Sequence, residues 1–436
     1  MCISELAKGT PTLVAHTALR YPIRVDPLAG ELSGRGAGPA ASTSNRADGP
    51  HLGHRFDSAV FLTDMERRKV GILGATGMVG QRFIQLLNNH PWFEVAWLAA
   101  SDRSAGKTYG EACKWKLDTP LPARIAAMTV MPNVPSGTPD GELPKIIFAA
   151  LDAEHALELE PKFAAAGCAV VSNSSAFRMA ADVPLVVPEV NADHLTLIEQ
   201  QSWRKTLDDG RPGGYIVTNP NCCAIGLVLA LKPLEERFGI ESLFVSTMQA
   251  VSGAGYPGVA SLDILGNVIP YIKNEEEKLQ EEVGKLLGRL GRGGVEMLDA
   301  KLSAHCNRVA VEDGHMECVS IKLRTKASRQ DMLAAWSEFA PLAGQKLPTA
   351  PEQPVEFDES PDRPQPRLDR MRGHGMAATV GRLRECNLLD WKFVVLSHNT
   401  IRGAAGAAVL NAEVLARLGK LDFKKAEVAQ RDVVLA

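Results

Sequence analysis

Two adjacent cysteines, Cys222 and Cys223, are the residues of this chain with the clearest capacity for covalent chemistry. They follow Asn-Pro-Asn in the stretch NPNCCAIGLVLALKPL, where a strand-like run stops and an apolar run begins. The turn predicts a helix that starts at Cys222, and a sulfur at a helix N-terminus has a lowered pKa. Buried cysteines are most often inert hydrophobic residues, so a nucleophilic role depends on the groups nearby.

Three further polar side chains stand at the ends of strand-like runs in the same half of the chain. Gln249 ends one run, directly before a glycine-rich turn, and Arg308 and His315 precede the run MECVSIKL. Seen singly, each is more typical of a surface, ion-paired or hydrogen-bonded residue. Together, a thiol, an imidazole, an amide and a guanidinium are the groups of an oxidising thiol site.

A glycine-rich loop indicates a dinucleotide. Gly74, Gly77 and Gly80 in GILGATGMVG follow one strand-like run and open a helix-like one. Such glycines permit a tight turn and let backbone N–H groups at a helix N-terminus approach a pyrophosphate. The spacing is GxxGxxG and not the commoner GxGxxG, so simple turn glycines are the alternative interpretation.

The next strand-like run ends in AASDRSAGK, a little over 20 residues past the glycine loop, where ribose selectivity is usually set. Asp102 suits a free 2′-hydroxyl, whereas Arg103 with Ser101 and Ser104 suits a 2′-phosphate. The two side chains therefore favour opposite cofactors, and ordinary surface polarity is the alternative for each.

The elements that position these residues fall into two groups. Short apolar runs alternate with helix-like stretches over 79–89 and 153–166, which predicts βαβ units and a parallel sheet buried on both faces. The apolar runs are 69–73, 93–100, 145–150 and 169–172. After Tyr215, longer and partly alternating runs predict a mixed or antiparallel sheet. These runs are 242–250, 316–323 and 391–398.

Two later segments complete this outline. The proline-rich stretch over 348–369 is expected to be a long irregular surface excursion. The stretch over 403–419 predicts a C-terminal helix closed by Gly419. The fold class is therefore α/β, with a Rossmann-type dinucleotide-binding domain and a second, α+β domain that has a mixed sheet.

Length and composition agree with two domains and exclude several kinds of protein. The chain has 436 residues, of which 45% are hydrophobic, and its 48 Lys and Arg nearly balance 51 Asp and Glu. The chain has no basic block of the kind that indicates nucleic-acid binding. It also has no apolar run that approaches the roughly 20 residues of a membrane helix. The eight cysteines form no CxxC pairs, which argues against disulfides or a metal site and favours the cytoplasm.

The first 64 residues differ from the rest. They are rich in Gly, Ala, Ser and Arg and have no helical or strand period, so we expect a disordered extension. The sequence MERRKVGILGATG at Met65 looks like a natural start, and an organelle transit peptide is the other possibility.

As a set, seven motifs resemble aspartate-semialdehyde dehydrogenase, particularly its archaeal and fungal-like branch. They are GILGATGMVGQRF, ASDRSAGK, SNSSAFRM, NPNC, QAVSGAG, NRVAVEDGH and LSHNTIRGAAGAAVLNAEVL, and they span about residues 66–420 in order. This family reduces β-aspartyl phosphate with NADPH in the aspartate-family pathway to Lys, Met, Thr, Ile and diaminopimelate. The resemblance also implies a homodimer or homotetramer.

The resemblance implies a role for each residue of the site. Cys222 is the nucleophile, His315 the acid/base and Gln249 the residue that orients the acyl intermediate. Arg308 binds the substrate carboxylate and Glu275 its amino group. The phosphate-site positions are Arg178, Asn221 and Lys278. The expected NADP contacts are Gly74, Thr76, Gly77, Met78, Val79, Gly80, Ser101, Arg103, Ser104 and Asn399, the last for the nicotinamide amide.

The same resemblance predicts the domain limits and reveals two departures. We expect an NADP-binding domain over 65–217, completed by 402–436, and a catalytic and dimerisation domain over 218–401. The family usually has Ser or Thr at the position of Cys223, which we expect to be a packing residue. Asp102 replaces a neutral residue and puts exclusive use of NADP in doubt.

Three alternatives stay open. A malonyl-CoA reductase of the same fold would keep Cys222, His315 and the nucleotide loop. N-acetyl-glutamyl-phosphate reductase fits less well, because its motif has glycine where this chain has Asn221. A non-catalytic paralogue acting as an interaction protein would be expected to lose Cys222 or His315, and both are present.

Overall fold

The computed structural model describes residues 67–137, 141–205, 207, 210 and 212–422. The helices and strands of the described residues all belong to one unit of the chain, Leu62–Ala436. Residues 1–64, which are expected to be disordered, lie outside the described residues. The part of the expected C-terminal segment after residue 422 also lies outside them.

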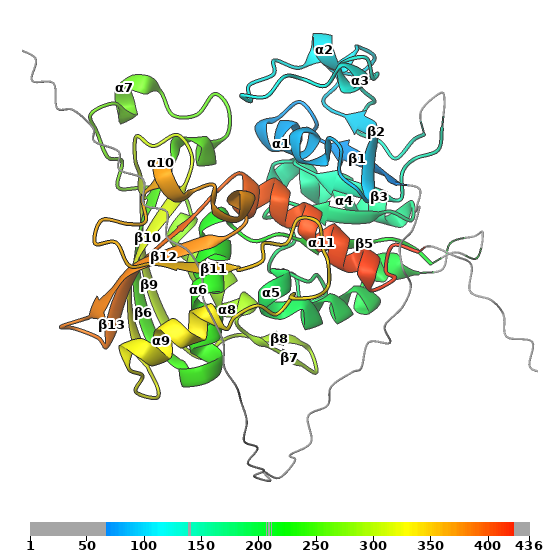
Figure 1. The fold of residues 1–436 in the computed structure, drawn as a ribbon. Coiled ribbons are helices and arrows are strands. Elements are labelled where there is room, and N and C mark those ends of the chain that lie inside the picture. Colours follow the sequence, from blue (N-terminus) through cyan, green and yellow to red (C-terminus); the bar gives the residue numbers. More distant parts are fainter. Residues whose placement is uncertain (1–66, 138–140, 206, 208–209, 211, 423–436) are drawn as a thin grey trace, which may run out of the picture. The chain divides into compact units, whose positions relative to one another are not determined.

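The first sheet is parallel throughout, with strand order β2-β1-β3-β4-β5 (Figure 1). Its strands are β1 Arg68–Leu73, β2 Phe93–Ala99, β3 Ile146–Ala149, β4 Ala169–Ser172 and β5 Tyr215–Thr218. The inner strands β3 and β4 are buried at every position, as expected for a sheet covered on both faces. The predicted Rossmann-type sheet is confirmed.

Helices from both ends of the described chain cover this sheet. The long ones are α1 Met78–Leu87, α4 Ala153–Ala165 and α11 Gly406–Arg417. Apolar residues of α1 and α11 share one core cluster with β1, β3 and β5. A π-helical turn, η5 Ile401–Ala405, leads into α11, and Gly419 (φ +67°) follows its end with the backbone bond Lys420 N–H to Leu415 O at 2.9 Å. The predicted C-terminal helix is thus present and ends with a glycine cap.

The second sheet is mixed, with strand order β11-β12-β13-β10-β6-β9. Its strands are β6 Ile240–Gln249, β9 Lys301–Arg308, β10 His315–Leu323, β11 Val355–Asp358, β12 Ala378–Glu385 and β13 Trp391–Ser397. Pairs β6–β9 and β11–β12 are parallel, and the others are antiparallel. The predicted mixed sheet is confirmed.

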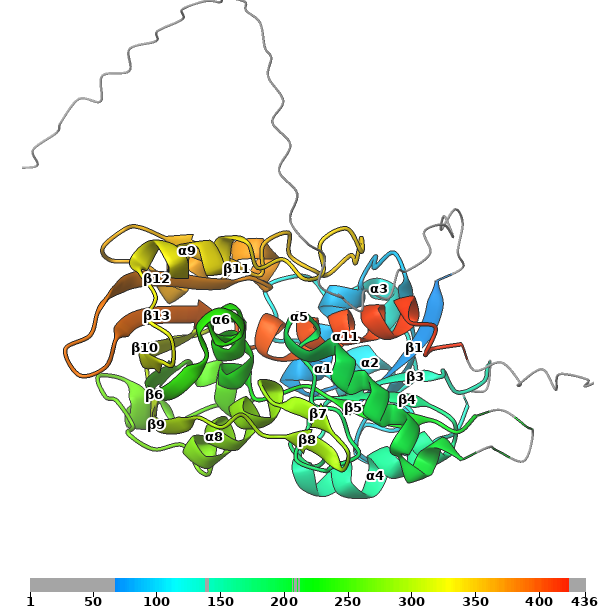
Figure 2. The same ribbon diagram turned by 90° about the horizontal axis from the view of Figure 1, so that it is seen from below.

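Three helices cover one face of the second sheet: α6 Cys222–Phe238, α8 Glu275–Leu286 and α9 Arg329–Ser337. Figure 2 shows α6 beside β6 and β10, between α8 and α9. The strands alternate buried and exposed residues, so the opposite face is accessible. Helix α6 begins at Cys222, and β6 ends at Gln249.

The remaining elements are short. The helices are α2 Tyr109–Ala112, α3 Ala123–Ala126, α5 Pro188–Asn191, α7 Ser261–Ile264 and α10 Pro366–Asp369. The 3-10 turns are η1 Ala192–Gln200, η2 Ser202–Arg204, η3 Val251–Ala254 and η4 Arg372–Gly375. Strands β7 Arg289–Gly291 and β8 Gly294–Glu296 form a separate hairpin. Within the described part of the chain, no helix has the length and apolar character needed to span a bilayer.

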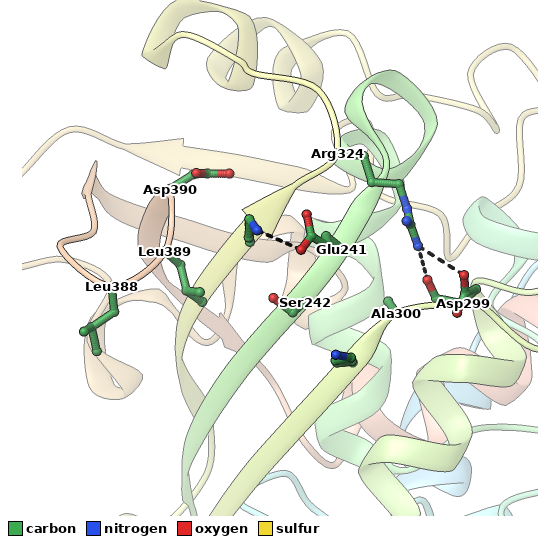
Figure 3. A pocket seen from close by; sticks show the side chains of 10 residues that line it. Glu241, Ser242, Asp299, Ala300, Arg324, Leu388, Leu389 and Asp390 are labelled. Carbon is green, nitrogen blue, oxygen red and sulfur yellow. Dashed lines mark hydrogen bonds and ion pairs between the residues drawn. The ribbon is translucent and has the colours of Figure 1, made fainter.

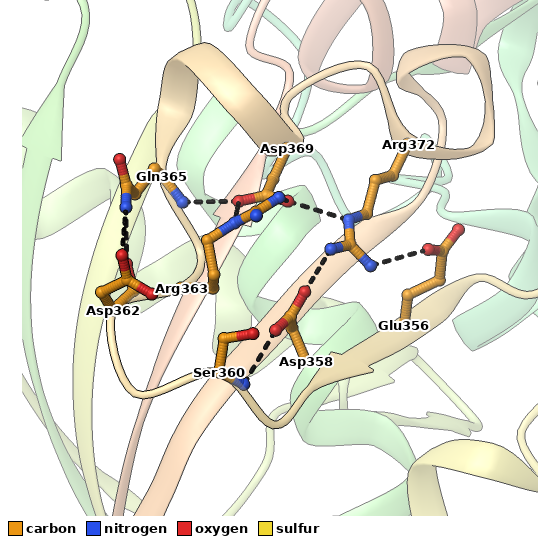
Figure 4. Close-up of polar contacts among 8 residues, drawn as sticks. All are labelled: Glu356, Asp358, Ser360, Asp362, Arg363, Gln365, Asp369 and Arg372. Carbon is orange, nitrogen blue, oxygen red and sulfur yellow. Dashed lines mark hydrogen bonds and ion pairs between the residues drawn. The ribbon is translucent and has the colours of Figure 1, made fainter. Parts of the chain in front are cut away.

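The expectation of a wholly irregular excursion over 348–369 is wrong. This stretch contributes the edge strand β11, parallel to β12, and the helix α10. The prolines flank the four-residue strand and do not interrupt it, which an edge position tolerates. Buried Asp369 also binds Arg363 at 2.7 Å and Arg372 at 2.9 Å and so orders the segment (Figure 4).

Candidate active site

The two groups predicted to do covalent chemistry lie side by side. Cys222 is the first residue of α6 and His315 the first of β10, and His315 Nε2 lies 3.1 Å from Cys222 Sγ. His315 Nδ1 accepts the backbone N–H of Ala250 at 3.1 Å. Because Nδ1 is an acceptor, the proton of the neutral ring is on Nε2, facing the sulfur.

The surroundings of Cys222 favour its thiolate. The pKa of Cys222 is well below its usual range, chiefly because the Cys223 thiol hydrogen-bonds to it, with further contributions from His315 and Arg178 against the effect of burial. Burial and the adjacent Cys222 raise the pKa of Cys223. The side chain of Cys223 is fully buried in the core of the second domain, whereas Cys222 is half-buried. The two sulfurs therefore have opposite chemical character.

One carboxylate oxygen organises the amides around the thiol. Glu275, the first residue of α8, accepts through Oε1 from Asn221 Nδ2 at 2.8 Å and from Gln249 Nε2 at 2.9 Å. Asn221 also caps α6, since its Oδ1 accepts the Cys223 N–H at 2.7 Å. This contact is the usual satisfaction of a helix N-terminus by Asn. The start of α8 thus holds both the turn before Cys222 and the end of β6.

Arg308 completes this group from the neighbouring strand. It is the last residue of β9, pairs in register with Gln249, and donates from Nη1 to Ala250 O at 2.8 Å. A Cβ at Gly253 would lie 2.8 Å from Arg308 Nη1 and 2.9 Å from His315 Nε2. The absence of a side chain at Gly253 therefore lets the turn pack against both residues.

Two cations lie on the α8 side. Arg178 is 9% exposed and donates from Nη1 to Glu282 at 2.9 Å and from Nη2 to Asn173 O at 2.8 Å. Lys278 is half-buried one turn after Glu275, and among the described residues it has no ion-pair partner. Arg178 also acts electrostatically on Cys222, so its positive charge reaches the thiol.

The glycine loop has the geometry that a dinucleotide pyrophosphate requires. Gly74 has φ +81°, and a Cβ at Gly80 would lie 2.4 Å from Gly74 O. Gly77 caps α1 without a side-chain hydrogen bond, so the backbone N–H groups of the first turn, which include those of Met78 and Val79, are free for an anion.

Two side chains near this loop bind its carbonyl oxygens. Tyr109 donates its hydroxyl to Ala75 O at 2.8 Å, and Gln81 donates to Thr76 O at 3.1 Å. The turn after β2 leaves Asp102 and Arg103 exposed. The residues present therefore fit a dinucleotide. Two other residues expected to contact the cofactor lie in the same turn: Ser101 is exposed, and Ser104 is buried.

Asn399 bridges two loops of the site. Its Oδ1 accepts the Gly314 N–H at 2.8 Å, and its Nδ2 donates to Ser252 Oγ at 2.8 Å. The loops that contain Gly314 and Ser252 adjoin His315 and Gln249. A contact between Asn399 and nicotinamide stays a prediction.

Sequence reasoning missed several residues that shape this site. Glu282 and Lys285 follow Glu275 by seven and ten residues on α8, a helical spacing that could have revealed a shared face. Gly403 was also missed: a Cβ there would lie 2.7 Å from Cys222 Cβ. Its proximity to Cys222 depends on long-range packing that no local pattern reports.

A separate surface pocket lies at the other end of β6 (Figure 3). Glu241 binds Lys322 there at 2.7 Å, beside Arg324 and Asp299. Gln249 is eight residues further along the strand, roughly 26 Å away at the usual rise per residue. This pocket is therefore distinct from the candidate active site.

Comparison with known proteins agrees with this geometry. The family model described as "Semialdehyde dehydrogenase, NAD binding domain" matches residues 69–198, and "Semialdehyde dehydrogenase, dimerisation domain" matches residues 231–402. A relative in Archaeoglobus fulgidus named aspartate-semialdehyde dehydrogenase is 51% identical over 349 residues, 80% of this chain and 98% of the relative. One of the same name in Candida albicans is 47% identical over 362 residues, again 80% and 98%.

Solved structures give the same result. The crystal structure of aspartate-semialdehyde dehydrogenase with NADP from Candida albicans has a TM-score of 0.74 and 45% identity, and covers 80% of this chain and 98% of that one. Aspartate-semialdehyde dehydrogenase II complexed with ASA from Vibrio cholerae has a TM-score of 0.62 and 26% identity, with 81% and 99% covered. The resemblance found in the motifs is confirmed, and the chain belongs to the aspartate-semialdehyde dehydrogenase family.

Proposed function

We propose that this chain reduces β-aspartyl phosphate to aspartate semialdehyde and phosphate, with NADPH as reductant and a thioester on Cys222 as intermediate. The observation that carries this proposal is the 3.1 Å contact between Cys222 Sγ and His315 Nε2, with Arg308 packed beside His315 at Gly253. The named relatives and the NADP-bound structure of a relative support the same substrate and cofactor. The product belongs to the aspartate-family route to amino acids.

The first step forms the thioester. The Cys222 thiolate attacks the acyl carbon, the carbon–oxygen bond to phosphate breaks, and phosphate leaves with the electron pair and takes up a proton. Arg178 and Lys278 supply positive charge for that leaving group, since a guanidinium suits phosphate oxygens. Arg308 and Glu275 hold the substrate's carboxylate and amino group, whose charges they complement.

The second step reduces the thioester. NADPH, when bound, supplies the hydride for the thioester carbonyl. His315 holds the proton on Nε2 that hydrogen-bonds the oxyanion so formed, because its Nδ1 is occupied by the Ala250 N–H. The oxyanion then re-forms a carbonyl, and the carbon–sulfur bond breaks to release the aldehyde and the Cys222 thiolate. In this cycle His315 stabilises charge at oxygen and then at sulfur.

Two assays separate this function from its rival. We expect NADP reduction with aspartate semialdehyde plus phosphate, and no NADPH oxidation with malonyl-CoA. Activity only with malonyl-CoA would replace the proposal with the reductase alternative. Absence of both activities in a folded protein that binds NADP would favour the non-catalytic paralogue.

A homodimer is part of this proposal. The face of the second sheet opposite α6 and α8 exposes Phe244 (39%) and Cys318, within the segment that matches the dimerisation domain model. We propose that this face pairs two copies of the chain, whereas a tetramer requires a further surface. Sedimentation should give a dimer or larger species at micromolar concentration, and monomer alone would contradict the proposal.

The domain limits and the location follow from the same reasoning. We propose that 65–217 and the C-terminal helix form the NADP-binding domain and that 218–401 form the catalytic and dimerisation domain. The described cysteines are free thiols, in keeping with the expected cytoplasmic setting, which stays a prediction.

A further inference from the structure

Helix α8 presents one charged stripe to the interior of the protein. Glu275, Lys278, Glu282 and Lys285 follow each other at intervals of three, four and three residues, which places them on one side of the helix. Glu275, Glu282 and Lys285 are 8%, 2% and 3% exposed. Charged side chains are rarely buried to this extent unless they are paired, so the stripe must satisfy specific partners.

Lys285 anchors the stripe to the segment that carries Arg178. Its ammonium donates to the carbonyl oxygens of Arg178, Ala180 and Val183 at 2.7, 2.7 and 2.9 Å. All three hydrogens of the ammonium are thereby used. The backbone around Arg178 is therefore held against α8, independently of any ligand.

Glu282 joins this segment to the turn before the nucleophile. Its Oε1 accepts from Arg178 Nη1 at 2.9 Å, and its Oε2 accepts the backbone N–H of Asn221 at 2.5 Å. One carboxylate thus contacts both the guanidinium proposed to bind phosphate and the residue directly before Cys222. A carboxylate that accepts from two donors in this way fixes their separation and orientation.

One nitrogen of the Arg178 guanidinium has no hydrogen-bond partner among the described residues. Nη1 is bound to Glu282 and Nη2 to Asn173 O, while the buried Nε has no hydrogen-bond partner among the described residues. A buried donor without a partner is costly and rare. An anionic oxygen is the acceptor that a guanidinium held in this way would take.

We infer that Glu282 is a positioning residue for phosphate, which acts through Arg178. It holds the guanidinium by Nη1 so that Nε is left for a phosphate oxygen beside Lys278. The negative charge of Glu282 also offsets the positive charge of one of the two cations, Arg178 and Lys278. Phosphate is therefore held less tightly and can be released in each cycle. This inference rests on the proposed function and adds a residue to its phosphate half-site.

The test replaces Glu282 by Gln. A glutamine has one acceptor and one NH2 group, so either Arg178 or the Asn221 N–H must face a donor. We expect KM for phosphate in the oxidative direction to rise at least about tenfold, the loss associated with one charge-assisted hydrogen bond. The KM values for aspartate semialdehyde and NADP should stay within about twofold. Glu281→Gln, at an exposed position of the same helix, is the matched control and should leave all three unchanged.

A burst experiment separates this inference from the function on which it rests. Aspartate semialdehyde and NADP without phosphate should give one equivalent of NADPH per site in the wild type and in Glu282→Gln, because thioester formation needs no phosphate. No burst in the wild type would refute the function. A normal burst with an unchanged KM for phosphate in Glu282→Gln would refute the inference.

A double variant tests whether Glu282 acts through Arg178. In an Arg178→Ala background, Glu282→Gln should change KM for phosphate little further, because the residue that it positions is gone. Independent, multiplicative effects would contradict the inference. Should Glu282→Gln fail to fold, Glu282→Asp, which keeps the charge but withdraws it by one methylene, is subject to the same expectations and the same refutation.

Discussion

Glu189 and Arg402 form a buried ion pair with two parallel hydrogen bonds, Nη1 to Oε1 at 2.8 Å and Nη2 to Oε2 at 2.7 Å. Neither side chain is exposed to solvent. Arg402 directly precedes Gly403, against which Cys222 packs. The pair therefore holds the segment that packs against Cys222, the proposed nucleophile, although neither residue is among those proposed to bind substrate.

Breaking this pair should cost more than replacing it. Arg402→Met leaves the Glu189 carboxylate buried and unpaired, which we expect to lower the free energy of unfolding by about 3–5 kcal/mol. The double variant Glu189→Leu with Arg402→Met should recover most of that loss, because two apolar residues of similar volume need no partner. Urea denaturation of the single and double variants measures this, and additive losses would contradict it.

The Cys222 sulfur is predicted to be the only one that forms the thioester. Cys222→Ser should abolish detectable hydride transfer while NADP still binds, because a hydroxyl is barely ionised near neutral pH. Cys223→Ser should keep most activity. Mass spectrometry after brief alkylation locates the reactive sulfur, and labelling at Cys223 would overturn the assignment.

The Cys223 thiol is predicted to do more than fill space. It is the largest single cause of the low pKa of Cys222, so Cys223→Ala should raise that pKa and leave less thiolate at neutral pH. Alkylation of Cys222 should then be slower near pH 7 but reach the same rate at alkaline pH. An unchanged pH midpoint would show that Cys223 only packs.

The sequence predicted those elements whose own residues indicate their structure, and it missed those that depend on pairing with distant parts of the chain. The first sheet followed from its apolar runs, and the predicted strand at 169–172 coincides with β4. Strands β9 and β12 were missed because their sequences, KLSAHCNR and ATVGRLRE, are largely polar. Their pairing with β6 and β13 supplies the stabilisation that their own side chains do not indicate.

The residues of the candidate site also differ in whether a local motif or only a distant contact reveals them. Cys222, His315 and Arg308 are recognisable from motifs because each stands next to a turn that has a characteristic sequence. Glu282 has no such motif, and its importance lies in contacts with Arg178 and Asn221, which are distant in the sequence. The helical spacing could have placed Glu282 on the same face as Glu275, but only the folded chain reveals its partners, because they are set by helix packing.

Arg103 is predicted to set the preference for NADP. It is exposed in the turn after β2, where a guanidinium can bind a 2′-phosphate, while Asp102 disfavours that charge. Arg103→Ala should lower the ratio of kcat/KM for NADP to that for NAD by about tenfold, the scale of one charge-assisted contact. Asp102→Ser should raise the same ratio. An unchanged ratio in Arg103→Ala would refute this assignment.

Glu160 should make the protein less stable as the pH rises toward neutrality. It is fully buried on α4, its Oε1 accepts the Ser172 hydroxyl at 2.6 Å, and its Oε2 has no partner among the described residues. Burial raises the pKa of Glu160 to about 7, against the opposing hydrogen bond of Ser172, from an ordinary value of 4.5. The folded protein therefore keeps a proton that the unfolded chain releases above pH 4.5.

The sign of the effect follows from this proton. The free energy of unfolding is not reduced by Glu160 below about pH 4.5, where the side chain is protonated in both states. It decreases as the pH rises and reaches its minimum above about pH 7. The total loss is about 3 kcal/mol, at about 1.4 kcal/mol per pH unit. Glu160→Gln keeps an acceptor for Ser172 and does not titrate. Its free energy of unfolding relative to wild type should therefore increase by up to about 3 kcal/mol between pH 4.5 and pH 8. Glu154→Gln, at an exposed position of the same helix, should show no such trend, and parallel pH curves for wild type and Glu160→Gln would mean that Glu160 is ionised in the folded protein.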